Sequence, residues 1–115
     1  MTRTRASARA AGRKWENDIA AALREHSWPH AERRVLAGAR DRGDITGVPR
    51  VVIEAKNERK ITLSSYVDEA NAEAENDNAD IGVAWVKRRG RASAADGYVV
   101  MDGSTFMELL KAAGY

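Results

Sequence analysis

The chain has 115 residues, of which 43% are hydrophobic and 31% charged, and its formal net charge is +2 at pH 7. This length suits one domain over residues 1–115, with residues 1–14 as a basic arm or helix extension. No stretch is long and apolar enough to span a membrane. The absence of cysteine excludes disulfides, thiolate metal sites and cysteine nucleophiles, so a bound metal ion would be held mainly by oxygen.

The first expected element is a helix over residues 8–24. Trp15, Ile19 and Leu23 recur at i, i+4 and i+8, which places them on one apolar face. The helix should end before Pro29, because proline disfavours helical geometry in the residue before it.

Three β-strands are expected next. Residues 30–37 and 41–46 have β-compatible patterns, and Gly47 and Pro49 indicate a turn. Residues 50–57 contain the β-branched run Val-Val-Ile and form the clearest strand. We therefore expect an antiparallel meander.

The second half should contain a helix over residues 63–78, a strand over 81–86 that is apolar enough for burial on both faces, and a strand over 98–101. Ser104 is the expected cap of a last helix over 105–113. The inward residues of the two helices should be Leu63, Val67, Ala70, Ala74, Phe106, Leu109 and Leu110. The predicted order is α-β-β-β-α-β-β-α, an α/β fold with helices flanking a mixed sheet.

Three residues of the meander suggest chemistry. Side chains alternate along a strand, so Glu54 and Lys56 should share one face of the sheet. If the hairpin is centred near Pro49, Asp44 lies opposite Glu54, with Cβ atoms roughly 5 Å apart. Adjacent carboxylates repel, and a divalent cation such as Mg²⁺ or Mn²⁺ relieves that repulsion. Hydrolysis of a phosphodiester uses such an ion together with a nearby lysine. The alternative is that all three are ordinary exposed residues.

Charged residues form blocks of opposite sign. The basic blocks are the predicted DNA phosphate contacts: Arg3, Arg5, Arg9, Arg13, Lys14, Lys87, Arg88, Arg89 and Arg91. The acidic stretch, interpreted as a face turned to water, comprises Asp68, Glu69, Glu73, Glu75, Asp77 and Asp80. For each block, a merely solvated face remains the alternative.

These motifs resemble the PD-(D/E)XK nuclease superfamily, and within it the archaeal-type Holliday junction resolvases and their small phage-encoded relatives. The resemblance covers nearly the whole chain. Asp44, Glu54 and Lys56 match the aspartate, second acid and lysine of the motif, and Glu16 matches the first-helix glutamate of resolvase-type members. Gly43 stands where the motif name has proline, a departure that many relatives share.

The resemblance implies a restriction-endonuclease-like fold and Mg²⁺- or Mn²⁺-dependent hydrolysis of DNA. The implied metal ligands are Asp44, Glu54 and Glu16, with Lys56 as a further catalytic residue. It also implies a homodimer that acts on four-way junctions, in the cytoplasm of a prokaryotic or phage-infected cell. From spacing alone, Glu16 is equally well an ordinary helix acid.

Two other functions remain open: a nicking, flap or fork endonuclease of the same fold, and a non-catalytic DNA-binding module. Among single residues, Asp41 is a rival ligand that strand alternation places on the opposite face from Asp44. His26 and His30 are expected at the surface. Weaker candidates for phosphate or water contacts are Asn57, Ser64 and Ser65. A candidate interface comprises Trp28, Val35 and Leu36.

Overall fold

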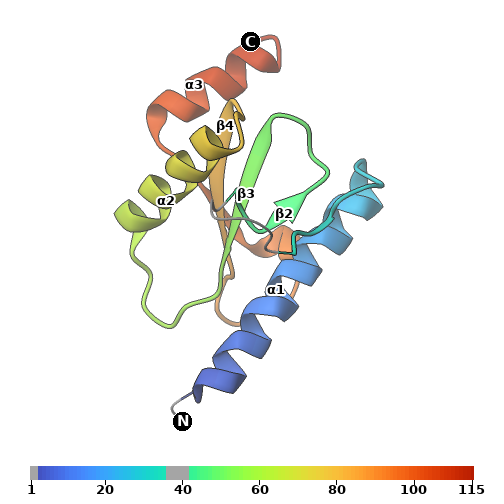
Figure 1. The fold of residues 1–115 in the computed structure, drawn as a ribbon, viewed down its shortest axis with the longest axis vertical. Coiled ribbons are helices and arrows are strands. Elements are labelled where there is room, and N and C mark those ends of the chain that lie inside the picture. Colours follow the sequence, from blue (N-terminus) through green and yellow to red (C-terminus); the bar gives the residue numbers. More distant parts are fainter. Residues whose placement is uncertain (1–2, 36–41) are drawn as a thin grey trace.

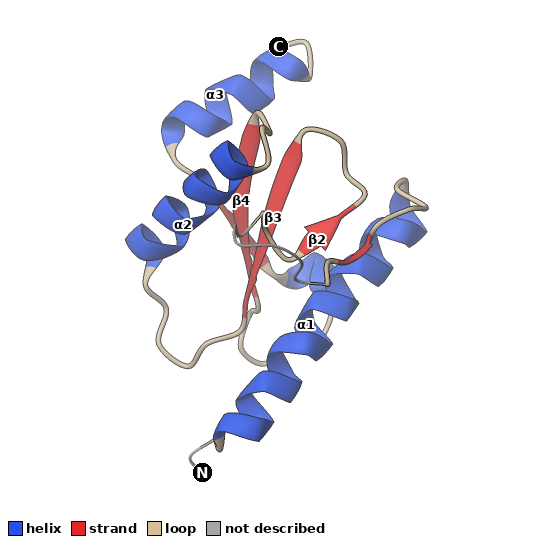
Figure 2. Cartoon of the chain, in the orientation of Figure 1, coloured by secondary structure: helices blue, strands red, loops and turns tan. Residues whose placement is uncertain are grey.

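The computed structural model describes residues 3–35 and 42–115, and in them a five-stranded mixed sheet is flanked by three α-helices (Figures 1 and 2). The α/β class expected from the sequence is therefore confirmed. The elements are α1 (Arg5–His26), β1 (Glu32–Arg33), β2 (Ile45–Thr46), β3 (Val51–Lys56), α2 (Leu63–Asn76), β4 (Ile81–Val86), a short 3₁₀ helix η1 (Ala94–Asp96), β5 (Tyr98–Val100) and α3 (Gly103–Ala112).

The five strands lie across the sheet in the order β1-β2-β3-β4-β5. Strands β3 and β4 are parallel and are connected by α2, whereas all other neighbours are antiparallel. The first three strands thus form the expected antiparallel meander. The first two are shorter than expected, with two residues each. Residues 36–41, which include Leu36 and Asp41, lie outside the described residues.

Helix α1 is longer at both ends than the sequence pattern predicts. Thr4 caps it, because its side-chain oxygen accepts a hydrogen bond from the backbone N–H of Ser7 at 3.0 Å. Residues 5–14 of the basic N-terminal segment are therefore a helix extension. The first turn of α1 lies at the opposite end of the molecule from α3 (Figure 1). Among the described residues, no helix has the length and apolar character that a membrane span requires.

The two faces of the sheet pack against different helices. On one face, Ile53 and Val83 join a cluster with Trp15 and Ile19 of α1. On the other, Ala84 and Val86 pack against Tyr66 of α2. Neighbouring residues of a strand point to opposite faces of the sheet. The side chain of Ile53 therefore points toward α1, and that of Glu54 points toward α2.

Two glycines allow close backbone contacts that set this geometry. Gly47 has a φ of +99°, and a Cβ there would lie 2.3 Å from the carbonyl oxygen of His30, so the β2–β3 hairpin packs tightly on the preceding chain. A Cβ on Gly82 would lie 2.4 Å from the carbonyl oxygen of Ala70. Helix α2 therefore lies very near β4.

Two expectations about the faces of α2 are wrong: that Leu63 faces inward and that Glu73 faces water. Leu63 is 54% exposed, and Tyr66 and Glu73 are buried on the inner face of α2 beside Ala70. At Gly82 the helix lies so near β4 that only small residues, Ala70 and Ala74, fit at the point of contact.

The expected cap and inner face of α3 also need correction. Asp102 is the cap in place of Ser104, since its carboxylate accepts from the Thr105 N–H at 2.8 Å. Phe106 is 48% exposed, because α3 packs on the rest of the molecule mainly through Leu109.

Candidate functional site

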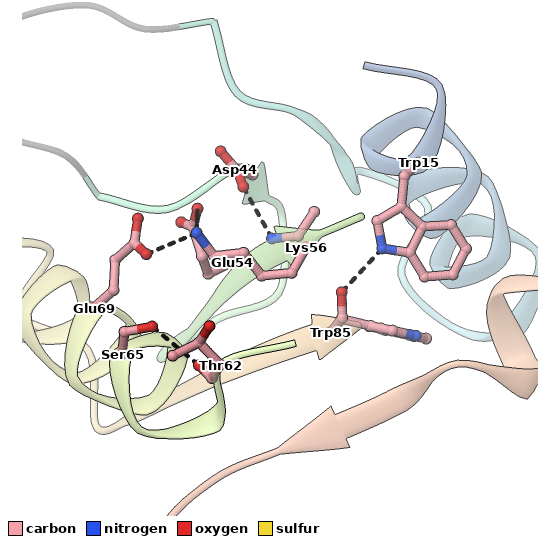
Figure 3. Close-up of polar contacts among 9 residues, drawn as sticks. Trp15, Asp44, Glu54, Lys56, Thr62, Ser65, Glu69 and Trp85 are labelled. Carbon is pink, nitrogen blue, oxygen red and sulfur yellow. Dashed lines mark hydrogen bonds and ion pairs between the residues drawn. The ribbon is translucent and has the colours of Figure 1, made fainter. Parts of the chain in front are cut away.

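The meander brings Asp44 and Glu54 together as the sequence predicts. Ile45 pairs with Ile53 across β2 and β3, so the residues on either side of this pair, Asp44 and Glu54, face each other. The backbone N–H of Ala55 donates to Oδ2 of Asp44 at 2.9 Å, which fixes the Asp44 carboxylate over β3 (Figure 3). The aspartate is thus positioned by the neighbouring strand.

Glu54 is the most constrained acid of the site. Only 5% of the residue is exposed, and its Oε2 is buried without a hydrogen-bond partner among the described residues. Burial raises the pKa of the Glu54 carboxyl, and the adjacent carboxyls of Glu73 and Asp44 raise it further, to about 12. Several carboxyl groups therefore crowd one small volume.

Lys56 is the cation of this cluster. Its Nζ lies 3.7 Å from Oε1 of Glu54 and 2.7 Å from Oε2 of Glu69 (Figure 3). It also lies 5.3 Å from the centre of the Tyr66 ring. Burial acts to lower the pKa of Lys56, but the hydrogen bond with Glu69 and the charge of Glu54 outweigh it, so the pKa lies above its usual value. The side chain is therefore an ammonium at neutral pH.

Glu16 reaches the same region from α1. Burial raises the pKa of Glu16, and the charge of Asp44 raises it further, which places the two carboxylates near each other. The Nε of Arg33 lies 3.2 Å from Oε2 of Glu16 and partly neutralises it. The four predicted residues thus form a chain of neighbours: Glu16 lies near Asp44, Asp44 near Glu54, and Glu54 near Lys56.

Two further acids belong to this cluster, and the sequence interpretation missed both. The sequence pattern predicts that Glu69 and Glu73 of α2 face water, but Glu73 is only 2% exposed. One carboxylate oxygen from each of Glu54, Glu69 and Glu73 lies within 4.8 Å of the others. A usable signal exists in the sequence: Glu73 lies seven residues after Tyr66 and three after Ala70, on their face of the helix.

The secondary candidates have other partners or lie at the surface. Asn57 accepts hydrogen bonds from the Arg3 guanidinium through its backbone oxygen at 3.0 Å and its side-chain oxygen at 3.5 Å. The hydroxyl of Ser65 donates to the Thr62 carbonyl at 3.0 Å, and Ser64 is exposed. His26 and His30 are exposed as expected. Of the candidate interface, Val35 is 77% exposed, whereas Trp28 packs against the α1 cluster.

A basic pocket lies just beyond the end of β3. It has a volume of about 610 Å³ and begins at Asn57, the residue after Lys56. Arg88 stacks over the Tyr98 ring, with the guanidinium carbon 5.5 Å from its centre. The residues that line the pocket are Arg3, Asn57, Glu58, Arg59, Ile61, Lys87, Arg88, Arg89, Gly90 and Tyr98.

Four of the nine predicted phosphate contacts therefore line one pocket: Arg3, Lys87, Arg88 and Arg89. The other five do not line it. Lys14 pairs with Asp18 at 2.8 Å, and Arg91 lies 3.9 Å from Asp96. The remaining three lie exposed along α1: Arg5, Arg9 and Arg13.

Comparisons with protein-family models, with curated proteins and with solved structures give no significant match.

Proposed function

We propose that this chain is a metal-dependent endonuclease with a restriction-endonuclease-like fold, and that its substrate is branched DNA, specifically the four-way Holliday junction. The observation that carries the proposal is the juxtaposition of Asp44 and Glu54 across β2 and β3, with the Lys56 ammonium beside them. The basic pocket begins one residue beyond Lys56. The two acids, the lysine and the cations of the basic pocket therefore lie next to one another.

The donor atoms suit a hard divalent cation. Asp44 and Glu54 offer carboxylate oxygens, Glu16 lies near Asp44, and the buried Oε2 of Glu54 has no hydrogen-bond partner in the described part of the chain. Oxygen ligands without thiolate or imidazole favour Mg²⁺ or Mn²⁺. Such an ion polarises the phosphoryl oxygens of a phosphodiester and activates a water molecule.

The protein side chains have separate roles in this proposal. Asp44 is held in place by the Ala55 N–H and acts as a ligand with Glu54. Lys56 stays charged, so it stabilises negative charge that develops on the phosphate and does not act as a base. Arg3, Lys87, Arg88 and Arg89 bind the DNA backbone next to the cut phosphate.

The four-way junction, the homodimer and a prokaryotic or phage-infected cell as the setting follow from the motif resemblance. A pocket built from phosphate-binding cations supports recognition of backbone and shape. Cleavage of nicked, flapped or forked DNA is the same chemistry on another branched substrate, and binding without cutting is the non-catalytic alternative.

The test is a cleavage assay on a labelled four-way junction, a 5′ flap and a linear duplex, with Mg²⁺, Mn²⁺ or EDTA. The key variant is Asp44→Asn, whose amide oxygen can still accept from the Ala55 N–H, so the fold should be retained. We expect cleavage to fall at least about 100-fold while junction binding persists. Asp68→Asn, an exposed acid on α2, is the matched control and should cut normally.

The outcomes separate the alternatives. Paired, metal-dependent nicks on the junction alone indicate a dimeric resolvase. Equal cutting of the flap retains the nuclease and removes the junction preference. Binding without cutting in either metal points to the non-catalytic module, and full activity of Asp44→Asn means that the site is wrongly assigned.

A further inference from the structure

The basic pocket contains an apolar part in addition to its cations. Two of the side chains that line it are large, apolar and half exposed: Tyr98 of β5 is 47% exposed, and Ile61, in the loop between β3 and α2, is 49% exposed. Binding of phosphates alone requires only cations and hydrogen-bond donors. The apolar part of the pocket therefore suits a different group of the ligand.

Tyr98 lies in the same row of the sheet as Lys56. Lys56 pairs with Val86 of β4, and Val86 pairs with Tyr98 of β5. Directly paired residues point to the same face of a sheet, so the Tyr98 side chain lies on the α2 face with Lys56. The Cα atoms of Lys56 and Tyr98 are two strand spacings apart, which is about 10 Å. A DNA strand whose cut phosphate lies beside Lys56 can therefore continue to the Tyr98 ring.

Arg88 and Tyr98 form a stacked pair in this pocket. The guanidinium carbon of Arg88 lies 5.5 Å from the centre of the ring. Its N–H groups have no hydrogen bond or ion pair among the residues that the structure describes. An arginine that stacks on an aromatic ring keeps these donors for a phosphate. Aromatic rings and guanidinium groups are also the surfaces on which unpaired bases stack.

The pocket is formed before any ligand binds. Arg3, which precedes α1, donates to the Asn57 carbonyl at 3.0 Å, and Arg89 donates to the Arg59 carbonyl at 3.5 Å. These bonds hold the segment after β3 against the other walls. The volume of about 610 Å³ lies in the range of roughly 300–1,000 Å³ that is typical of pockets enclosing a small ligand.

We propose that this pocket takes one unpaired nucleotide of the DNA strand, next to the cut phosphate. The base stacks on the Arg88–Tyr98 pair and contacts Ile61. The adjoining phosphates lie against Lys87 and Arg89. A paired base inside a duplex cannot reach the ring, so the pocket accepts only a base that has left the stack. Because every base has a π-face, the pocket selects strand structure and not sequence.

This inference rests on the proposed function, since branched DNA is taken as the substrate. It makes an unpaired nucleotide at the branch point the feature that distinguishes branched DNA from a continuous duplex. The binding itself does not require cleavage.

The experiment measures the fluorescence anisotropy of three labelled four-way junctions in EDTA, where no strand is cut. One junction is fully paired, one has a single unpaired thymidine at the crossover, and one has an abasic nucleotide there, which keeps the phosphate but lacks the base. We expect the wild-type chain to bind the thymidine junction at least about 5-fold more tightly than the other two, from one base–aromatic stack.

The key variant is Tyr98→Leu, which should bind all three junctions alike, whereas Tyr98→Phe keeps the ring and should retain the preference. The slope of log affinity against log salt should not change in Tyr98→Leu, because the cations remain. The matched control is Tyr115→Leu, which removes a ring that is 93% exposed and outside the pocket, and it should bind as the wild type does. If Tyr98→Leu does not fold, the thymidine and abasic junctions test the proposal on the wild type.

Equal binding of the thymidine and abasic junctions by the wild type, or an unchanged preference in Tyr98→Leu, overturns the nucleotide pocket. Displacement of the thymidine junction by thymidine monophosphate at concentrations near the Kd of the junction means that the pocket takes free nucleotides, which also overturns it. A preference without cleavage in Mg²⁺ retains the pocket and rejects the nuclease, whereas metal-dependent cleavage without the preference does the reverse.

Discussion

The two faces of the central sheet are built from the same strands but have different chemistry. Toward α1, Ile53 and Val83 pack against Trp15 and Ile19, all of them apolar. Toward α2, the next residue of β3 is Glu54, which lies buried beside Glu73. A one-residue step along one strand therefore passes from hydrocarbon to clustered carboxylates.

This difference separates stability from function. Each large apolar side chain buried on the α1 face contributes about 1.5–3 kcal/mol to folding. A carboxyl buried on the α2 face instead costs stability unless it is paired, protonated or bound to a cation. Strongly perturbed acids that a fold retains at a cost to its stability are more common at functional sites. The α1 face thus supports the sheet, and the α2 face carries the site.

The largest expected effect on stability is a break of the α1 face. Trp15→Ala should lower the free energy of unfolding by about 3–5 kcal/mol, because it leaves a cavity. It also removes the hydrogen bond from the indole N–H to the Trp85 carbonyl, 2.9 Å long. Urea denaturation measures this loss, and Trp15→Phe should lose less. A loss below 1 kcal/mol would show that the α1 face does not dominate stability.

On the α2 face, we expect a substitution that increases the free energy of unfolding. Glu73→Met replaces a carboxyl that lies against the buried Glu54 by an apolar side chain of similar length, so the metal-free protein should gain about 1–3 kcal/mol. Denaturation in EDTA measures the gain, with exposed Glu75→Met as the control. Destabilisation by Glu73→Met alone would mean that Glu73 holds the fold together.

The pH dependence should sharpen the same contrast. Burial, Glu73 and Asp44 raise the pKa of Glu54 in the folded chain above its usual 4.5. The folded state then keeps a proton that the unfolded state has lost, so the stabilisation present below pH 4.5 declines as pH rises toward the folded pKa. In EDTA, the free energy of unfolding should fall between pH 6 and 8, by up to about 1.4 kcal/mol per pH unit.

The control for this pH effect is Glu54→Gln, which cannot titrate. Its stability curve in EDTA should be flatter than that of the wild type over the same range. A wild-type curve that rises with pH would show that Glu54 is ionised in the metal-free fold.

The smallest expected effect is on DNA binding by the basic pocket, which lies beyond the ends of the strands and on neither face of the sheet. Arg89→Ala should weaken junction binding and reduce the slope of log affinity against log salt by roughly 0.9, the value for one phosphate contact. Fluorescence anisotropy over a salt series measures the slope. Lys111→Ala, on α3 outside the basic pocket, should leave the slope unchanged.

The elements predicted best from the sequence are those with strong local patterns. The strand at Ile81–Val86 has the expected bounds, because an apolar run between turn residues has few other solutions. The facing pair of Asp44 and Glu54 could also be predicted, since Gly47 and Pro49 fix the hairpin and strand alternation does the rest.

The part of the site on α2 could not be predicted because it depends on tertiary packing. An acidic helix usually turns its charges to water, and the spacing of Glu73 from Tyr66 and Ala70, the one local signal, does not by itself outweigh that expectation. The burial of Glu73 arises where α2 meets β4. The same applies to α3, whose Asp102 cap and exposed Phe106 depend on how the helix docks.

The absence of a side chain at Gly82 has a consequence for the spacing of two buried acids. Even one added carbon would lie 2.4 Å from the Ala70 carbonyl and 3.0 Å from the Ala74 Cβ, so a larger residue there must push α2 outward. Glu73, three residues after Ala70, would move with the helix while Glu54 stays in the sheet. The gap between the two carboxylates is therefore set by one missing methyl group.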